Sequence, residues 1–205
     1  MSVRIDKNES VWTVILSRPK AKNAIDPESA EALYEAFTDF DREDSASVAV
    51  LWGEGGAFSA GWDLKQAAAI DNDHFFEAHD MPKDNSEAPP ALLGPTRLEL
   101  DKPVIAAIAG PAVAGGMELA LWCDFRVMEA SAYFGVYCRR WGIPLIDGGT
   151  VRLPRLVGEG RARESESLLQ GSCPPKKKGS DNTRRAGRAG GRRGRGPEGT
   201  RGGVT

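Results

Sequence analysis

The sequence predicts an α/β fold with parallel strands. Three apolar segments, at 11–16, 47–52 and 103–109, are typical of buried strands, and the segment at 123–128 is predicted to be a further strand. Helical or turn-forming stretches separate them, and this alternation favours parallel pairing. The chain has 205 residues, a length that is enough for one domain with a sizeable core. Hydrophobic residues make up 40% of it and charged residues 27%, an ordinary composition for a globular protein.

The first of these strands, 11–16, is followed by a helix with a well-marked beginning. Asp26 is a typical N-cap residue, and Pro27 suits the first helical position. Apolar residues then recur at helical spacing through Asp41: Ala30, Leu33, Ala36 and Phe37. We therefore predict a helix over residues 27–41.

Turns of small residues follow the next two strands. The turn at 57–65 comes after the strand 47–52, and the turn at 110–117 comes after the strand 103–109. Small residues let a ligand approach the backbone closely, and a helix start offers N–H groups and a positive dipole end. If the two turns converge, they form an oxyanion hole with two donors. Glu118 is then the first carboxylate beside it.

Two regions lack this regularity. Residues 66–100 contain four prolines with acidic residues between them, and we expect mobile helices and loops there. Residues 162–205 carry eleven Lys or Arg against four Asp or Glu, and they include few large apolar side chains. Such a segment cannot offset its ordering entropy by burial. We predict one domain, 1–163, and a disordered basic Gly/Arg-rich tail, 164–205.

Five segments stand in a characteristic order: Ser17–Ala24, Phe58–Leu64, Gly115–Ala120, Phe134-Gly135 and Gly148–Arg155. Taken together over about residues 3–161, they resemble the crotonase (enoyl-CoA hydratase/isomerase) superfamily. The resemblance implies a spiral of ββα units followed by helices that cap the site and build a homotrimer or hexamer. These capping helices are expected to be missing here, and a shifted reading frame or a truncation near Arg163 would explain the change.

The resemblance also implies roles for particular residues. The backbone N–H groups of Ala60 and Gly115 would hold the thioester oxygen of an acyl-CoA. Glu118 matches the first of two catalytic glutamates, whereas Cys138 stands where the second is expected. Asp147 is either a replacement for that glutamate or a plain N-cap of the next helix. The residues expected to bind substrate are Lys22, Ala60, Gly61, Trp62, Asp63, Leu64 and Cys138.

The expected activity is that of an enoyl-CoA hydratase, a lyase that adds water to a 2-enoyl-CoA. In such an enzyme one carboxylate activates water and an acid protonates the α-carbon. Glu118 would take the main role, with Asp147 as its partner. Two alternatives stay open, namely a double-bond isomerase that works with one base and a non-catalytic or truncated acyl-CoA-binding fragment.

Other classes of function find little support. The three cysteines match no zinc spacing, and the chain has no phosphate-cradling Gly-Lys-Ser/Thr loop. We expect no metal and no cofactor apart from coenzyme A as part of the substrate. No apolar run spans a bilayer and the N-terminus lacks a signal region, so a cytoplasmic location is expected. The basic tail could bind RNA, but an incidental tail is favoured, and no nucleic-acid partner is expected.

Overall fold

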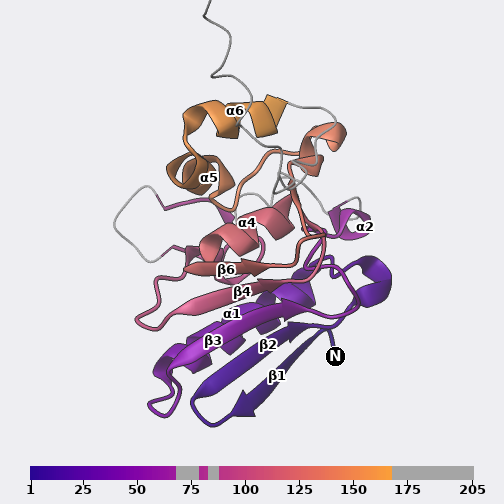
Figure 1. Cartoon of the computed structure of the whole chain (residues 1–205). Coiled ribbons are helices and arrows are strands. Elements are labelled where there is room, and N and C mark those ends of the chain that lie inside the picture. Colours follow the sequence, from indigo (N-terminus) through magenta and orange to yellow (C-terminus); the bar gives the residue numbers. More distant parts are fainter. Residues whose placement is uncertain (68–78, 83–87, 168–205) are drawn as a thin grey trace, which may run out of the picture. The chain divides into compact units, whose positions relative to one another are not determined.

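A five-stranded sheet forms the framework of the protein. The computed structural model describes residues 1–67, 79–82 and 88–167, and the strands follow the order β1-β2-β3-β4-β6 (Figure 1). Four of the strands pair in parallel: β2 (Val11–Leu16), β3 (Val48–Gly53), β4 (Val104–Ile108) and β6 (Phe125–Met128). The predicted α/β class and these four strands are confirmed.

The fifth strand, β1 (Val3–Asn8), pairs antiparallel with β2 and is absent from the sequence prediction. Only Val3 is buried in it, while the residues from Arg4 to Asn8 are exposed. An edge strand of this kind lacks the apolar run that reveals a buried strand, and its charged side chains protect the open edge. Pairing with β2 through a tight hairpin at Glu9, where φ is +51°, holds it in place.

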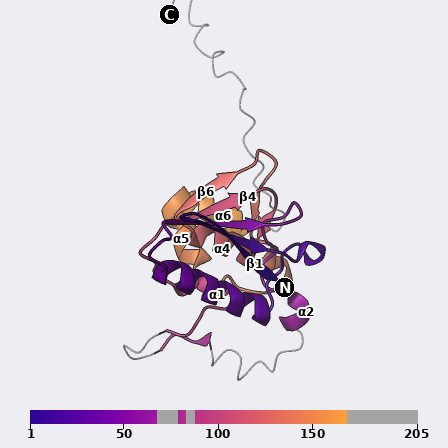
Figure 2. The same ribbon diagram turned by 90° about the horizontal axis from the view of Figure 1, so that it is seen from below.

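Helix α1 (Pro27–Arg42) covers one face of the sheet, as Figure 2 shows from below. The Asp26 carboxylate accepts the Ser29 N–H, which confirms the predicted N-cap. Phe37 and Phe40 are fully buried in the main core. The Phe37 ring also meets Trp122 edge-on at 4.9 Å between centroids, so α1 is packed against the helix that begins at the second glycine turn.

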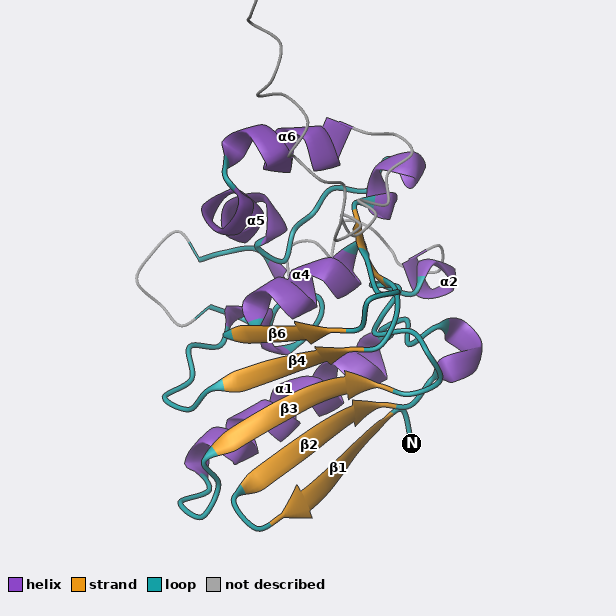
Figure 3. Ribbon diagram, viewed as in Figure 1, coloured by secondary structure: helices purple, strands orange, loops and turns teal. Residues whose placement is uncertain are grey.

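The carboxyl ends of the parallel strands point to the same edge of the sheet, and the loops after β3 and β4 run together there (Figure 3). Beside them, β5 (Ala112–Val113) and β7 (Phe134–Gly135) form a small parallel sheet. Ligands of α/β proteins commonly bind at this edge. The fold thus brings together the two turns that the sequence separates by about fifty residues.

The remaining helices lie outside the large sheet, with α4, α5 and α6 beyond its β6 side (Figure 1). They are η1 (Pro19–Ala21), α2 (Leu64–Ala67), η2 (Pro95–Arg97), α4 (Gly115–Trp122), η3 (Tyr137–Trp141), α5 (Gly149–Val157) and α6 (Glu159–Ser167). None of the described helices has the length and apolar character needed to cross a bilayer.

The predicted domain boundary stays a prediction. Helix α6 runs to Ser167 and therefore continues past residue 163. The rest of the predicted basic tail, 168–205, lies outside the described residues, as do 68–78 and 83–87 of the segment for which mobile helices and loops are predicted.

Candidate active site

The turns that follow β3 and β4 lie against each other, as the sequence predicts. The Phe58 N–H donates to the Pro111 carbonyl at 3.0 Å, and the Val113 N–H donates to the Ser59 carbonyl at 3.0 Å. Ser59 and Ala112 form a parallel bridge between the two turns. Backbone hydrogen bonds therefore hold the two predicted donor segments in one place.

Gly61 makes the closest approach between the turns possible. Its φ is +83°, and a Cβ at this position would lie 2.6 Å from the backbone nitrogen of Gly115. Atoms cannot approach so closely without displacing the backbone, and L side chains rarely adopt this φ. Only glycine allows the start of α4 to rest on the first turn.

The Ala60 N–H does not have the free position that its predicted role as an oxyanion donor requires. It already donates to the Lys22 carbonyl at 3.0 Å. Next along the chain, the Gly61 carbonyl accepts the Ile25 N–H and the Asp63 N–H donates to the Ile25 carbonyl, each at 2.8 Å. Because successive N–H groups alternate along an extended segment, the N–H of Trp62 points away from Ile25.

The second turn carries its donor at the start of α4. Gly115 is the first residue of this helix, and its N–H donates to no acceptor in the described part of the chain. The preceding Ala114 has φ 52° and ψ −127°, a conformation that is strained for a residue with a side chain. The Ala114 N–H donates to the Gly135 carbonyl at 2.7 Å, which helps to hold this conformation. Backbone strain thus occurs directly beside the candidate donor.

Two side chains with no predicted role fix the first turn. The buried Asn23 amide donates at 2.8 Å to the carbonyls of both Glu54 and Ala57. Arg18 forms ion pairs with Asp26 at 3.1 Å and with Asp63 at 2.9 Å. Both residues lie in the segment 17–24, whose resemblance to the family was the signal that could have drawn attention to them. Their partners could not be predicted, because they are distant in the sequence.

Glu118 lies on the first turn of α4, and only 2% of its surface is exposed. Its Oε1 accepts the backbone N–H groups of Asp147 and Gly149, each at 2.9 Å. No hydrogen bond within the described residues reaches Oε2. Desolvation raises the pKa of Glu118 to about 7, an effect that the two N–H donors oppose. The carboxyl group is thus balanced between its protonated and ionised forms near neutral pH.

Asp147 is not the N-cap of the following helix. The N-cap position of α5 belongs to Gly148 and has no side-chain hydrogen bond. Oδ1 of Asp147 instead accepts the Thr96 hydroxyl at 2.6 Å and the Leu93 N–H at 3.2 Å. Burial raises the pKa of the Asp147 carboxyl above its ordinary value. The N-cap interpretation is therefore wrong, while a role in chemistry stays a prediction.

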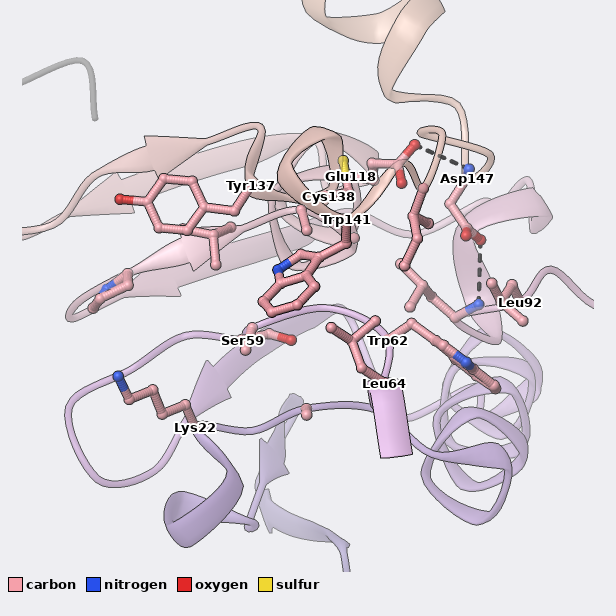
Figure 4. Close-up of a pocket in the computed structure, with 18 of the residues that line it drawn as sticks. Lys22, Ser59, Trp62, Leu64, Leu92, Glu118, Tyr137, Cys138, Trp141 and Asp147 are labelled. Carbon is pink, nitrogen blue, oxygen red and sulfur yellow. Dashed lines mark hydrogen bonds between the residues drawn. The ribbon is translucent and has the colours of Figure 1, made fainter. Parts of the chain in front are cut away.

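A cavity of about 370 Å³ joins these groups, a size suited to a small ligand. Figure 4 shows Lys22 at one end of it and Glu118 and Asp147 at the other. Gly61 and Asp63 are not among its lining residues, because Gly61 serves the close contact and Asp63 is paired with Arg18. The predicted site residues that do line it are Lys22, Ala60, Trp62, Leu64, Gly115, Glu118, Cys138 and Asp147.

Cys138 faces the same cavity from η3 and is 8% exposed. Burial and the nearby Glu118 carboxylate raise the pKa of the Cys138 thiol, so it is protonated at neutral pH. Cys138 therefore lies beside Glu118, where the second glutamate was expected, but as a neutral group. No cluster of three or more metal-binding side chains occurs in the described ranges.

The chain is similar to known proteins of one family. The family model described as Enoyl-CoA hydratase/isomerase matches residues 6–172. A solved enoyl-CoA hydratase from Mycobacterium marinum superposes with a TM-score of 0.72 at 32% identity, covering 84% of this chain and 63% of that one. An enoyl-CoA hydratase from Mycobacterium tuberculosis gives a TM-score of 0.68 at 33% identity, covering 85% of this chain and 68% of that one.

Curated relatives are similar as well. Carnitinyl-CoA dehydratases of Salmonella heidelberg and Salmonella agona are each 40% identical over 164 residues, which is 76% of this chain. The same alignment covers 56% of each relative, so the chain spans little more than half the length of these relatives.

The contact at Gly61 predicts a difference between two glycine substitutions. Gly56 has the same positive φ, +81°, but a Cβ there would meet nothing within 4 Å. Gly56→Ala should therefore cost only the backbone strain, about 1–2 kcal/mol. Gly61→Ala should cost clearly more, because it also forces the turns apart. Urea unfolding measures both, and equal losses would contradict the proposed close packing.

The pKa of Glu118 predicts a pH dependence of stability. Because the folded-state pKa, about 7, exceeds the ordinary value of 4.5, folding favours the protonated form. The stabilisation should be complete below pH 4.5 and lost as the pH rises through about 7. The free energy of unfolding of the wild type, relative to Glu118→Gln, should fall over this range. A flat difference, like that expected for the exposed control Glu129→Gln, would refute the burial effect.

Proposed function

Because the chain belongs to the enoyl-CoA hydratase/isomerase (crotonase) family, we propose that it binds an acyl-CoA thioester and adds water to a 2-enoyl group. The single observation that carries the proposal is Glu118: a buried carboxyl with a pKa of about 7, held by two N–H groups and facing the cavity beside Gly115. A carboxylate of this kind suits general acid–base chemistry at neutral pH.

In this proposal, the thioester oxygen accepts from the backbone N–H groups of Trp62 and Gly115. Trp62 replaces Ala60 as first donor because the Ala60 N–H is occupied by Lys22. Both Trp62 and Gly115 line the cavity. Two such donors stabilise the enolate that forms when a nucleophile attacks the β-carbon, and removing one such donor typically costs about 3–4 kcal/mol of barrier.

Glu118 acts as the base. Its Oε2 takes a proton from water while the water oxygen bonds to the β-carbon, and the electron pair of the double bond moves into the enolate. A proton then returns to the α-carbon. Asp147 is the candidate donor, because it lines the same cavity and burial raises its pKa. Glu118 then releases the proton it took to solvent and Asp147 regains one from solvent, which restores both groups for the next turnover. Substrate binding by Lys22, Leu64 and Cys138 is supported by their positions on the cavity wall.

One observation favours a second candidate activity, double-bond isomerisation. Cys138 is a protonated thiol where a second carboxylate was expected, so the site has fewer acid–base groups. An isomerase removes a proton from one carbon and returns it to another, which a single carboxyl such as Glu118 can do. The short span relative to the curated relatives keeps a third alternative open, an acyl-CoA-binding fragment without activity.

Replacing Glu118 by Gln tests the proposal. We expect kcat for hydration of crotonyl-CoA to fall by roughly 10²–10⁴-fold, because the base is lost while the cavity is kept. Binding of the acyl-CoA, measured by calorimetry, should be retained. Glu129→Gln, an exposed carboxylate outside the cavity, is the matched control. A 3-enoyl-CoA assayed in parallel separates isomerase from hydratase, and binding without turnover in the wild type would support the fragment.

We also propose that copies of the chain associate as a homotrimer or hexamer. Large apolar side chains are exposed on the edge strand β6, where Phe125 and Val127 are 61% and 65% accessible. Burial of such groups in a neighbouring copy would be favourable. Light scattering coupled to size-exclusion chromatography should give a trimer or a hexamer. A monomer at micromolar concentration would contradict the proposal.

A further inference from the structure

The turn between η3 and α5 holds Glu118 through its backbone alone. The N–H groups of Asp147 and Gly149 both donate to Oε1 of Glu118. A Cβ on Gly149 would lie 2.7 Å from Cγ of Glu118, so the turn is packed directly on this side chain. The position of the carboxyl group therefore depends on whatever fixes the turn.

Arg152, in the first helical turn of α5, holds this segment in place. Its Nη1 donates to the Asp147 carbonyl at 2.8 Å, and its Nη2 donates to the Thr96 carbonyl at 2.7 Å. The Thr96 hydroxyl in turn donates to Oδ1 of Asp147 at 2.6 Å. One guanidinium thus ties η2 to the turn that holds Glu118. A planar fork of donors suits two carbonyls at once, whereas an ammonium group does not reproduce it.

We propose that Arg152 is a positioning residue for Glu118: it holds the carbonyls of Asp147 and Thr96 together and so aims the two backbone N–H groups that bind Oε1. The geometric part of this proposal is independent of the reaction. Its catalytic consequence rests on the hydratase or isomerase activity proposed above.

The charges around Glu118 give the proposal a measurable signature. Asp147, Cys138 and Arg152 face Glu118, and the charge of Arg152 opposes the rise in the pKa of Glu118. Arg97 faces Asp147 from η2. Loss of the Arg152 charge removes this opposing effect, and loss of its hydrogen bonds loosens the two N–H donors. Both changes favour the protonated form and raise the pKa of Glu118.

The experiment compares Arg152→Gln and Arg152→Lys with Arg155→Gln, an exposed arginine on the same helix. Carboxyl ¹³C NMR titration follows Glu118, whose signal is assigned by its loss in Glu118→Gln. We expect Arg152→Gln to raise the midpoint by on the order of one pH unit, whereas Arg155→Gln leaves it unchanged. The acidic limb of the kcat–pH profile should move in the same direction.

Arg152→Lys separates charge from geometry. It keeps the positive charge but loses the fork, so the midpoint should rise less than in Arg152→Gln. We expect faster hydrogen exchange at the Asp147 and Gly149 amides and a kcat lower by roughly 10- to 100-fold. Retained exchange protection in Arg152→Lys, or an unchanged midpoint in a folded Arg152→Gln, would overturn the proposal.

If Arg152→Gln does not fold, the hydrogen-exchange rates of the Asp147 and Gly149 amides in Arg152→Lys test the proposal instead. These readouts also keep two failures apart. A wild type without activity toward any enoyl-CoA would refute the proposed function, while the titration and the amide exchange would still test the role of Arg152.

Discussion

The contact between Gly61 and Gly115 is the constraint on which the rest of the site depends. Because Gly61 has no side chain and adopts a positive φ, the first turn can lie directly under the first residue of α4. This contact sets the start of α4, and the start of α4 sets the position of Glu118 three residues later. The strained Ala114 and the buried tether at Asn23 serve the same close packing.

Burial and hydrogen bonding act in opposite directions on Glu118. Removal from water favours the neutral acid, while the N–H groups of Asp147 and Gly149 favour the carboxylate. The balance places the pKa near 7, where one group can both accept and return a proton. Only one carboxylate oxygen takes part in these bonds, so the protein holds the group firmly and still leaves Oε2 for chemistry.

The family relationship and the details of the site answer different questions. The matched family model and the superposed hydratases establish the fold and membership of the crotonase superfamily. The choice of reaction depends on the neighbours of Glu118, where a neutral thiol, Cys138, and a tethered aspartate, Asp147, lie on the cavity wall. A site with this composition has one well-placed base, Glu118, and two further protonatable groups on the same cavity wall.

The sequence by itself determined the parallel strands, helix α1, the two glycine turns and the place of Glu118, because apolar periodicity, capping and small-residue runs are local signals. Only the tertiary structure decided the partners of these groups. In the folded chain the Ala60 N–H donates to the Lys22 carbonyl, and the Asp147 carboxylate accepts the Thr96 hydroxyl. Arg152 donates to the turn that holds Glu118. These contacts join segments that are distant along the chain, or they depend on which way one backbone N–H group points. The spacing of residues along the sequence predicts neither the segments that meet nor the direction of an N–H group.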